Sequence, residues 1–208
     1  MAQFDRYAQP GSASRTGVAV DEGLRTYMLK VYNLMAIGLL VTAVAAYGVF
    51  SLAVDPSGNL TQFGATLYTG PMKWVLMLAP LALVFFLGFK INSMSVSAAQ
   101  TTFWVYAALV GASLSTILLL YTGASIFKTF AVTAAAFGSL SLYGYTTKRD
   151  LTGMGSFLIM GLFGIIIASL VNLFLGSPAI EFAVSIFGVL IFAGLTAYDT
   201  QKIKEMYY

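Results

Sequence analysis

The chain has 208 residues, of which 59% are hydrophobic and 9% are charged, and its mean hydropathy is +0.84. A soluble domain carries about 25% charged residues, so this composition excludes an ordinary soluble protein and indicates a polytopic membrane protein. The net charge of +3 comes from basic residues that lie mostly between apolar blocks, so we expect it to set membrane orientation and we expect no nucleic-acid partner.

Cysteine and histidine are both missing from the sequence. Their absence excludes disulfides, thiolate and histidine metal sites, cysteine nucleophiles and serine–histidine catalysis. A titration near neutral pH would have to come from a carboxylate whose pKa is shifted.

Residues 1–24 are polar, rich in Gly, Ser and Ala, and lack periodic apolar positions. They predict a flexible tail, followed by a transmembrane helical domain over residues 25–208. The first apolar block starts only after Lys30 and runs to Ala53, which is too long for the apolar region of a cleaved signal peptide.

Six apolar blocks follow the tail, and each can cross a hydrocarbon core, which takes about 20 helical residues. They lie near residues 31–53, 72–90, 100–122, 125–146, 155–176 and 179–201. The second block contains Pro80, which removes one backbone hydrogen bond and predicts a kink. The sequence therefore predicts an all-α fold, a polytopic bundle of six transmembrane helices.

The basic residues predict the orientation of this bundle. With the amino terminus inside, the cytoplasmic segments hold nine Lys and Arg residues and the opposite side holds two, Lys73 and Lys128. The nine are Arg6, Arg15, Arg25, Lys30, Lys90, Lys148, Arg149, Lys202 and Lys204. Because basic residues are enriched in cytoplasmic loops, both the tail and the Lys202–Lys204 end are predicted to be cytoplasmic.

Only two acidic residues, Glu181 and Asp199, lie inside an apolar block, and both belong to the sixth. Their separation of 18 residues corresponds to about 27 Å of helix, so they cannot form a carboxylate pair. Glu181 follows Pro178 in the first turn, where a negative charge suits the helix dipole. We interpret it as a helix-start residue.

Asp199 lies in the last turns of its helix, where the dipole disfavours an anion. Lys202, three residues on, and Lys90, predicted at the same membrane face, are possible ion-pair partners. Two interpretations stay open for Asp199, an interfacial ion pair and a functional carboxylate. In the fifth block, Asn172 is predicted to make a structural hydrogen bond between helices rather than to bind an ion.

Enzymatic functions find little support in this inventory of residues. An intramembrane aspartyl protease also uses a Tyr-Asp pair such as Tyr198-Asp199, but it needs a second membrane aspartate on another helix. No phosphate-binding glycine loop is present. We therefore expect neither an enzyme nor a tightly bound cofactor.

Three segments carry a resemblance to a known family. The run Gly194-Leu-Thr-Ala-Tyr-Asp-Thr-Gln-Lys-Ile-Lys204 closely resembles the signature of the Bax inhibitor family, also called the transmembrane Bax inhibitor motif or lifeguard proteins. The runs Leu142-Tyr-Gly-Tyr-Thr-Thr-Lys-Arg-Asp150 and Ala168-Ser-Leu-Val-Asn-Leu-Phe174 are similar to its bacterial branch. The similarity extends over all six blocks.

The resemblance implies a helical bundle that leaks or exchanges calcium in a pH-dependent way, with a pair of aspartates as proton sensor. Asp199 matches one member of that pair, and the family carries the other on a seventh helix. The chain ends at Tyr208 without such a segment, so we expect that helix to lie outside this sequence. In this view the partners are the lipid bilayer, calcium ions and protons, in a bacterial plasma (inner) membrane.

A second function follows from the same resemblance, because some relatives are thought to act by binding other membrane proteins. The protein would then regulate membrane proteases or cell-survival factors without transporting an ion, and the signature run would be structural. Both functions remain open on the sequence alone.

Overall fold

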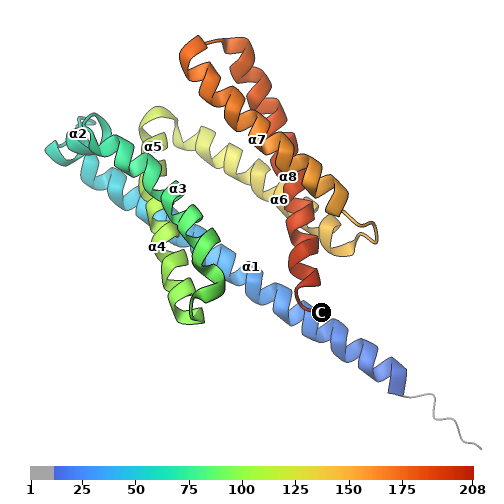
Figure 1. Ribbon diagram of the computed structural model, residues 1–208. Coiled ribbons are helices and arrows are strands. Elements are labelled where there is room, and N and C mark those ends of the chain that lie inside the picture. Colours follow the sequence, from blue (N-terminus) through green and yellow to red (C-terminus); the bar gives the residue numbers. More distant parts are fainter. Residues whose placement is uncertain (1–11) are drawn as a thin grey trace, which may run out of the picture. The chain divides into compact units, whose positions relative to one another are not determined.

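The computed structural model describes the backbone of residues 12–208 and the side chains of residues 22–208. Its regular elements are all helical (Figure 1): α1 (Ser12–Ala53), α2 (Gln62–Tyr68), α3 (Met72–Lys90), η1 (Ile91–Ser93), α4 (Val96–Leu114), α5 (Ile117–Leu120), α6 (Gly123–Thr146), α7 (Thr152–Leu175) and α8 (Pro178–Glu205). Within the described residues the only strand-like pairing is an isolated bridge between Val54 and Leu60.

Six helical segments of the described chain are long and apolar enough to cross a membrane. They are Glu22–Ala53, Met72–Ser93, Val96–Leu120, Gly123–Thr146, Thr152–Leu175 and Pro178–Glu205. The predicted all-α fold with six membrane-spanning helices is confirmed.

The start of α1 differs from the expectation. The sequence predicted a tail through residue 24, whereas the helix begins at Ser12. Residues 13–24 contain two Ala and one each of Arg, Glu and Leu, which are good helix formers, but they also contain two Gly residues and lack apolar periodicity, so the sequence did not predict this helical segment. The rest of the predicted tail, residues 1–11, lies outside the described residues.

The chain divides into two compact units. One combines the start of α1, as far as Met28, with residues Lys128–Tyr208, and the other is the continuous segment Leu29–Phe127. The first unit therefore joins parts from both ends of the sequence.

In the Leu29–Phe127 unit, small residues let α1 and α4 approach closely. Gly111 lies against the backbone carbonyl of Thr42, and the hydroxyl of Thr42 donates to the carbonyl of Ala107 over 2.9 Å. Gly38 lies against the ring of Phe103, so that a Cβ atom there would come within 2.6 Å of the ring. Close backbone approach of this kind stabilises helix pairs in lipid through van der Waals contact and interhelical hydrogen bonds.

α3 continues as a helix through Pro80. Proline has no N–H, so the carbonyl four residues earlier, that of Leu76, loses its intrahelical partner. The hydroxyl of Ser113 on α4 donates to this same carbonyl. A side chain of the neighbouring helix thus satisfies the group that the proline leaves free, which is how membrane helices tolerate proline.

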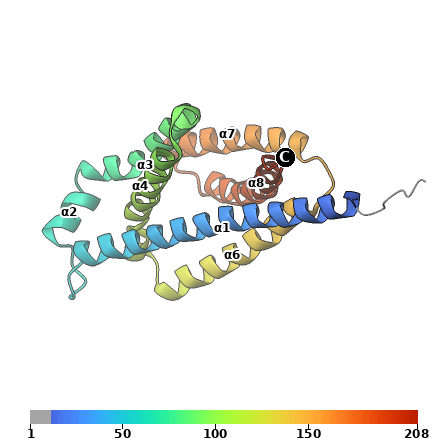
Figure 2. The ribbon, with the colours of Figure 1, turned by 90° about the horizontal axis from the view of Figure 1, so that it is seen from below.

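In the other unit, α7 and α8 form an antiparallel pair, side by side in both views (Figures 1 and 2). Three glycine contacts fix their register: Gly155 with Tyr198, Gly161 with Ile191 and Gly194 with Leu158. The turn between the helices uses Gly176 in the left-handed conformation, with φ of 60°, which glycine adopts without steric cost.

Candidate functional site at the end of α8

One face of the last turns of α8 is buried against α6 and the loop that follows it. Gly144 of α6 lies so close to Ala197 that a Cβ atom on the glycine would overlap the alanine carbonyl oxygen. Further along, the ammonium group of Lys204 donates to the carbonyl of Tyr145 over 2.8 Å and lies 5.2 Å from the centre of the Tyr145 ring. These contacts extend the helix to Glu205, beyond the predicted end at residue 201.

Gln201 contacts the 147–151 loop through both polar atoms of its amide. Its Oε1 accepts a hydrogen bond of 2.8 Å from the backbone N–H of Leu151, and its Nε2 donates one of 2.7 Å to the carbonyl of Arg149. Gln201 is buried, with 8% of its surface exposed. A buried amide with both groups paired stabilises a single arrangement, because a lost partner would leave a desolvated polar group.

The loop itself is ordered by Asp150. Its carboxylate accepts a hydrogen bond of 2.8 Å from the backbone N–H of Thr152, at the start of α7. Hydrogen bonds from the side chain and the backbone of Thr152 lower the pKa of Asp150, because they favour the ionised form. The loop therefore keeps a carboxylate that is hydrogen-bonded to the first residue of α7.

Tyr198 fixes the other side of the same turn. Its ring lies on Gly155 of α7, where a Cβ atom would come within 2.6 Å of it. The ammonium group of Lys202 lies 5.9 Å from the centre of the Tyr198 ring, a cation–π distance. Both flanks of Asp199 along the chain are thus held by packing.

Asp199 itself is exposed. Within the part of the chain that the structure describes, its carboxylate forms no hydrogen bond and no ion pair. Lys202 acts on it electrostatically, but the lysine ammonium lies over Tyr198, so the predicted Lys202 ion pair does not form. Lys90 ends α3 in the other unit, and its pairing with Asp199 stays a prediction.

The described residues around this carboxylate do not form a metal centre. Among the described residues, no three acidic, histidine or cysteine side chains lie close enough together to hold a metal ion. The assignment of Asp199 to calcium and proton sensing therefore stays a prediction.

The other two residues singled out in the sequence have structural positions. Glu181 lies in the first turn of α8 after Pro178, as predicted. The side-chain oxygen of Asn172 accepts a hydrogen bond of 2.8 Å from the N–H of Ser177. This bond is structural, as expected, but it closes the turn between α7 and α8 instead of joining two helices midway.

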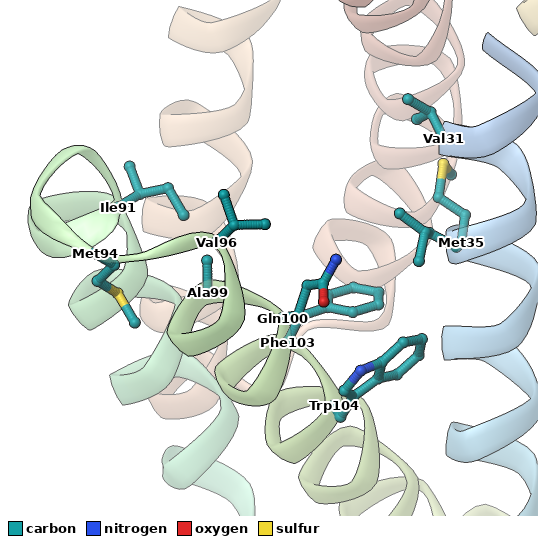
Figure 3. Close-up of a pocket in the computed structure, with 10 residues that line it drawn as sticks. Val31, Met35, Ile91, Met94, Val96, Ala99, Gln100, Phe103 and Trp104 are labelled. Atoms are coloured by element: carbon teal, nitrogen blue, oxygen red, sulfur yellow. The ribbon is translucent and has the colours of Figure 1, made fainter. Parts of the chain in front are cut away.

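The Leu29–Phe127 unit also has a groove on its surface (Figure 3). It has a volume of about 430 Å³ and lies between α1, η1 and the first half of α4. Its walls are apolar apart from the Gln100 amide and the Trp104 ring nitrogen. Without a carboxylate in its lining, the groove offers a cation no charged ligand.

Gln201, Gly144 and Gly155 are the residues of this region that sequence reasoning missed. From sequence alone, a glutamine close to two lysines at a helix end is interpreted as a solvent-exposed residue. Gln201 and Gly144 lie within segments that resemble the family and Gly155 lies close to one, and this was the only signal for them. Their roles depend on which helices meet, which spacing along one chain does not reveal.

These features define a class of protein, a polytopic helical membrane protein with an unpaired carboxylate near one end of its last described span. The chain belongs to the Bax inhibitor-1 family, since the family model described as "Inhibitor of apoptosis-promoting Bax1" matches residues 24–208. The predicted family is thereby confirmed.

Several bacterial proteins are similar to this chain. The uncharacterized protein RP147 of Rickettsia prowazekii is 54% identical over 193 residues, which cover 90% of this chain and 76% of that protein. An uncharacterized protein of Caulobacter vibrioides is 48% identical over 210 residues, covering 100% and 84%. The inner membrane protein YbhL of Escherichia coli K12 is 50% identical over 186 residues, covering 88% and 76%. No solved structure matches the chain.

Proposed function

We propose that this protein is a pH-sensitive calcium leak channel or cation/proton exchanger that is gated by protonation of Asp199. The observation that carries the proposal is the contrast within one helical turn. Tyr198, Thr200 and Gln201 are held by packing or hydrogen bonds, whereas the Asp199 carboxylate has no bonded partner among the described residues. An ionisable group left unpaired in a membrane helix favours a functional role.

The chemistry of a carboxylate suits this role. Ionised, it offers hard oxygen ligands to calcium; protonated, it loses its charge and attracts a cation far less. Calcium takes about six to eight oxygens, so Asp199 would supply only part of the shell of a passing ion. Calcium is therefore treated as the transported substrate and not as a resident cofactor.

We further infer that the protein lies in a bacterial inner membrane with its amino terminus in the cytoplasm. The name of the relative YbhL places that protein in the inner membrane, and the excess of basic residues on one side favours this orientation. The 147–151 loop and the Asp199 end of α8 would then lie at the cytoplasmic face.

Calcium flux through proteoliposomes tests the proposal. The full chain would be reconstituted with a calcium indicator inside the vesicles, and the flux measured over a series of pH values on either side of neutral. The wild type should show a pH-dependent flux. Asp199→Asn should lose the pH dependence, because an amide keeps the shape of the side chain but cannot ionise.

Glu181→Gln is the matched control, since it removes another acid of the same helix, at its opposite end. It should keep the wild-type pH profile. A pH profile that is the same in the wild type and in Asp199→Asn would refute the proposal, as would the loss of pH dependence in Glu181→Gln alone.

The second candidate is a non-transporting regulator that binds membrane proteases or cell-survival factors. It is favoured by the description of the family, "Inhibitor of apoptosis-promoting Bax1", which names an action on another protein. Under this proposal the full chain, purified from its native membranes, brings down a membrane protease in a fixed ratio and conducts no calcium in vesicles. Flux without any such partner would favour the first candidate.

A further inference from the structure

The direction in which the Asp199 side chain leaves α8 depends on the rotation of this helix about its own axis. Successive residues of an α-helix are turned by about 100°, so Asp199 lies about 200° from both Ala197 and Gln201. The burial follows this geometry. Ala197, Thr200 and Gln201 are 2%, 5% and 8% exposed, whereas Asp199 is exposed.

Gln201 connects this face of α8 to a neighbouring element, the 147–151 loop, through two hydrogen bonds. Its amide makes hydrogen bonds of 2.8 and 2.7 Å to the backbone at Leu151 and Arg149. Backbone groups of a loop cannot follow a turning helix as a flexible side chain can. A rotation of α8 would therefore break both bonds together and expose the amide inside a buried site.

We propose that Gln201 is a positioning residue: its two hydrogen bonds to the 147–151 loop fix the rotation of the last turns of α8 and so hold the Asp199 carboxylate on the face opposite that loop. The 147–151 loop contributes to this positioning, because its backbone supplies both hydrogen-bond partners of Gln201. The functional consequence rests on the proposed function of Asp199. The positioning itself does not.

Charged and titratable groups from several elements surround this turn. Lys202 and Lys204 lie on α8 itself, Tyr145 lies at the end of α6, and Tyr27 of α1 stacks with Tyr207 at a ring distance of 5.5 Å. The loop contributes Lys148, Arg149 and Asp150. A rotation of α8 about its own axis would change the distance of Asp199 from the groups on α6 and in the loop, whereas Lys202 and Lys204 turn together with Asp199.

A single-cysteine experiment tests the positioning. The chain has no cysteine, so Thr200→Cys introduces one reporter on the buried side of the turn while Asp199 stays in place. Thr200 donates only to the carbonyl of Thr196 in its own helix, so the change is mild. A water-soluble maleimide should label this cysteine slowly when Gln201 is native.

Gln201→Leu keeps the size of the side chain and removes both hydrogen bonds. Labelling of Thr200→Cys should then accelerate about tenfold, the change in population that loss of one to two net hydrogen bonds permits. A second single-cysteine reporter on the opposite face, Asp199→Cys, should be labelled more slowly in Gln201→Leu, because a rotation that exposes one face of a helix covers the other. Gln100→Leu makes the same chemical change in the groove of the other unit, and it should alter neither readout.

The outcomes separate the two proposals. If the wild-type flux does not depend on pH, the proposed function fails, and the labelling rate alone decides the role of Gln201. Equal labelling in Gln201→Leu and Gln100→Leu overturns the positioning role. Faster labelling of Thr200→Cys with unchanged labelling of Asp199→Cys would show loosening without rotation, and it also overturns the positioning role.

A second variant covers the case in which Gln201→Leu does not fold. Gln201→Asn keeps the amide but shortens the side chain by one methylene, so that it can keep at most one of the two hydrogen bonds, to Leu151 or to Arg149. In this variant, Thr200→Cys should be labelled at a rate between the rate with native Gln201 and the rate expected when both hydrogen bonds are lost. A native labelling rate in this variant would contradict the inference.

Discussion

A hydrogen atom on Gly144 occupies the space in which any other residue would carry a Cβ atom. That atom would overlap the backbone carbonyl of Ala197, and a backbone contact cannot be relieved by changing a rotamer. The close approach of α6 and α8 at the signature run therefore depends on the absence of one methyl group.

Gly144→Ala should lower the free energy of unfolding by about 1–3 kcal/mol, the usual cost of overpacking. Gly138→Ala is the matched control on the same helix, because nothing lies within 4 Å of its missing Cβ atom. That variant should be unchanged or up to about 1 kcal/mol more stable, since alanine favours a helix. Unfolding in detergent micelles, followed by circular dichroism, measures both. Equal stability of the two variants would contradict the expected difference.

Asp199 could be singled out from the sequence because an acid near the end of an apolar helix, where the helix dipole disfavours it, is conspicuous in the sequence. Its neighbour Gln201 could not. The significance of Gln201 comes from two backbone groups located 50 and 52 residues earlier in the chain. A polar side chain at a helix end looks the same in sequence whether it faces solvent or a loop.

At the scale of elements, α3 and α4 are joined by the hydrogen bond from Ser113 to the carbonyl of Leu76. This bond is needed because Pro80, four residues after Leu76, has no N–H to donate to the Leu76 carbonyl. The two residues should therefore be coupled in energy although they are on different helices.

A double-mutant cycle tests this coupling. Ser113→Ala should cost about 0.6–2 kcal/mol, because it leaves the Leu76 carbonyl without a partner inside the membrane. In a Pro80→Ala background the restored N–H pairs with that carbonyl, so the cost of Ser113→Ala should fall below about 0.5 kcal/mol. Additive costs in the thermal or detergent unfolding of the four proteins would argue against the coupling.

The elements themselves were predicted with uneven success, for physical reasons. α3 spans residues 72–90 as predicted, because Gly70 and Pro71 precede it and a charged residue ends it. The predicted block 100–122 is interrupted after Leu114, and α5 begins at Ile117. Buried Ser115 lies at this break and is hydrogen-bonded to Tyr68 over 2.8 Å. Hydropathy is continuous there, so only the tertiary contact marks the break.

At the scale of the whole molecule, the distribution of charge predicts the orientation in the membrane. Thr122→Cys and Lys148→Cys place single cysteines in the two loops that precede and follow α6. An impermeant maleimide added to intact spheroplasts should label the cysteine at 122 and reach the cysteine at 148 only after the membrane is opened. The reverse pattern would show that the nine-to-two asymmetry of basic residues does not set the orientation.

The division of the chain into a continuous and a discontinuous unit has a consequence for the time course of synthesis. The Leu29–Phe127 unit can complete its contacts while the ribosome is still making the rest of the chain. The start of α1 is made early, yet the helices that share its unit, from Lys128 onward, are made last. Contacts such as that between Tyr27 and Tyr207 join residues far apart in sequence, and such contacts form slowly. The start of α1 can therefore pack against the helices of its own unit, including α8 with the signature run, only after about a hundred intervening residues have been translated.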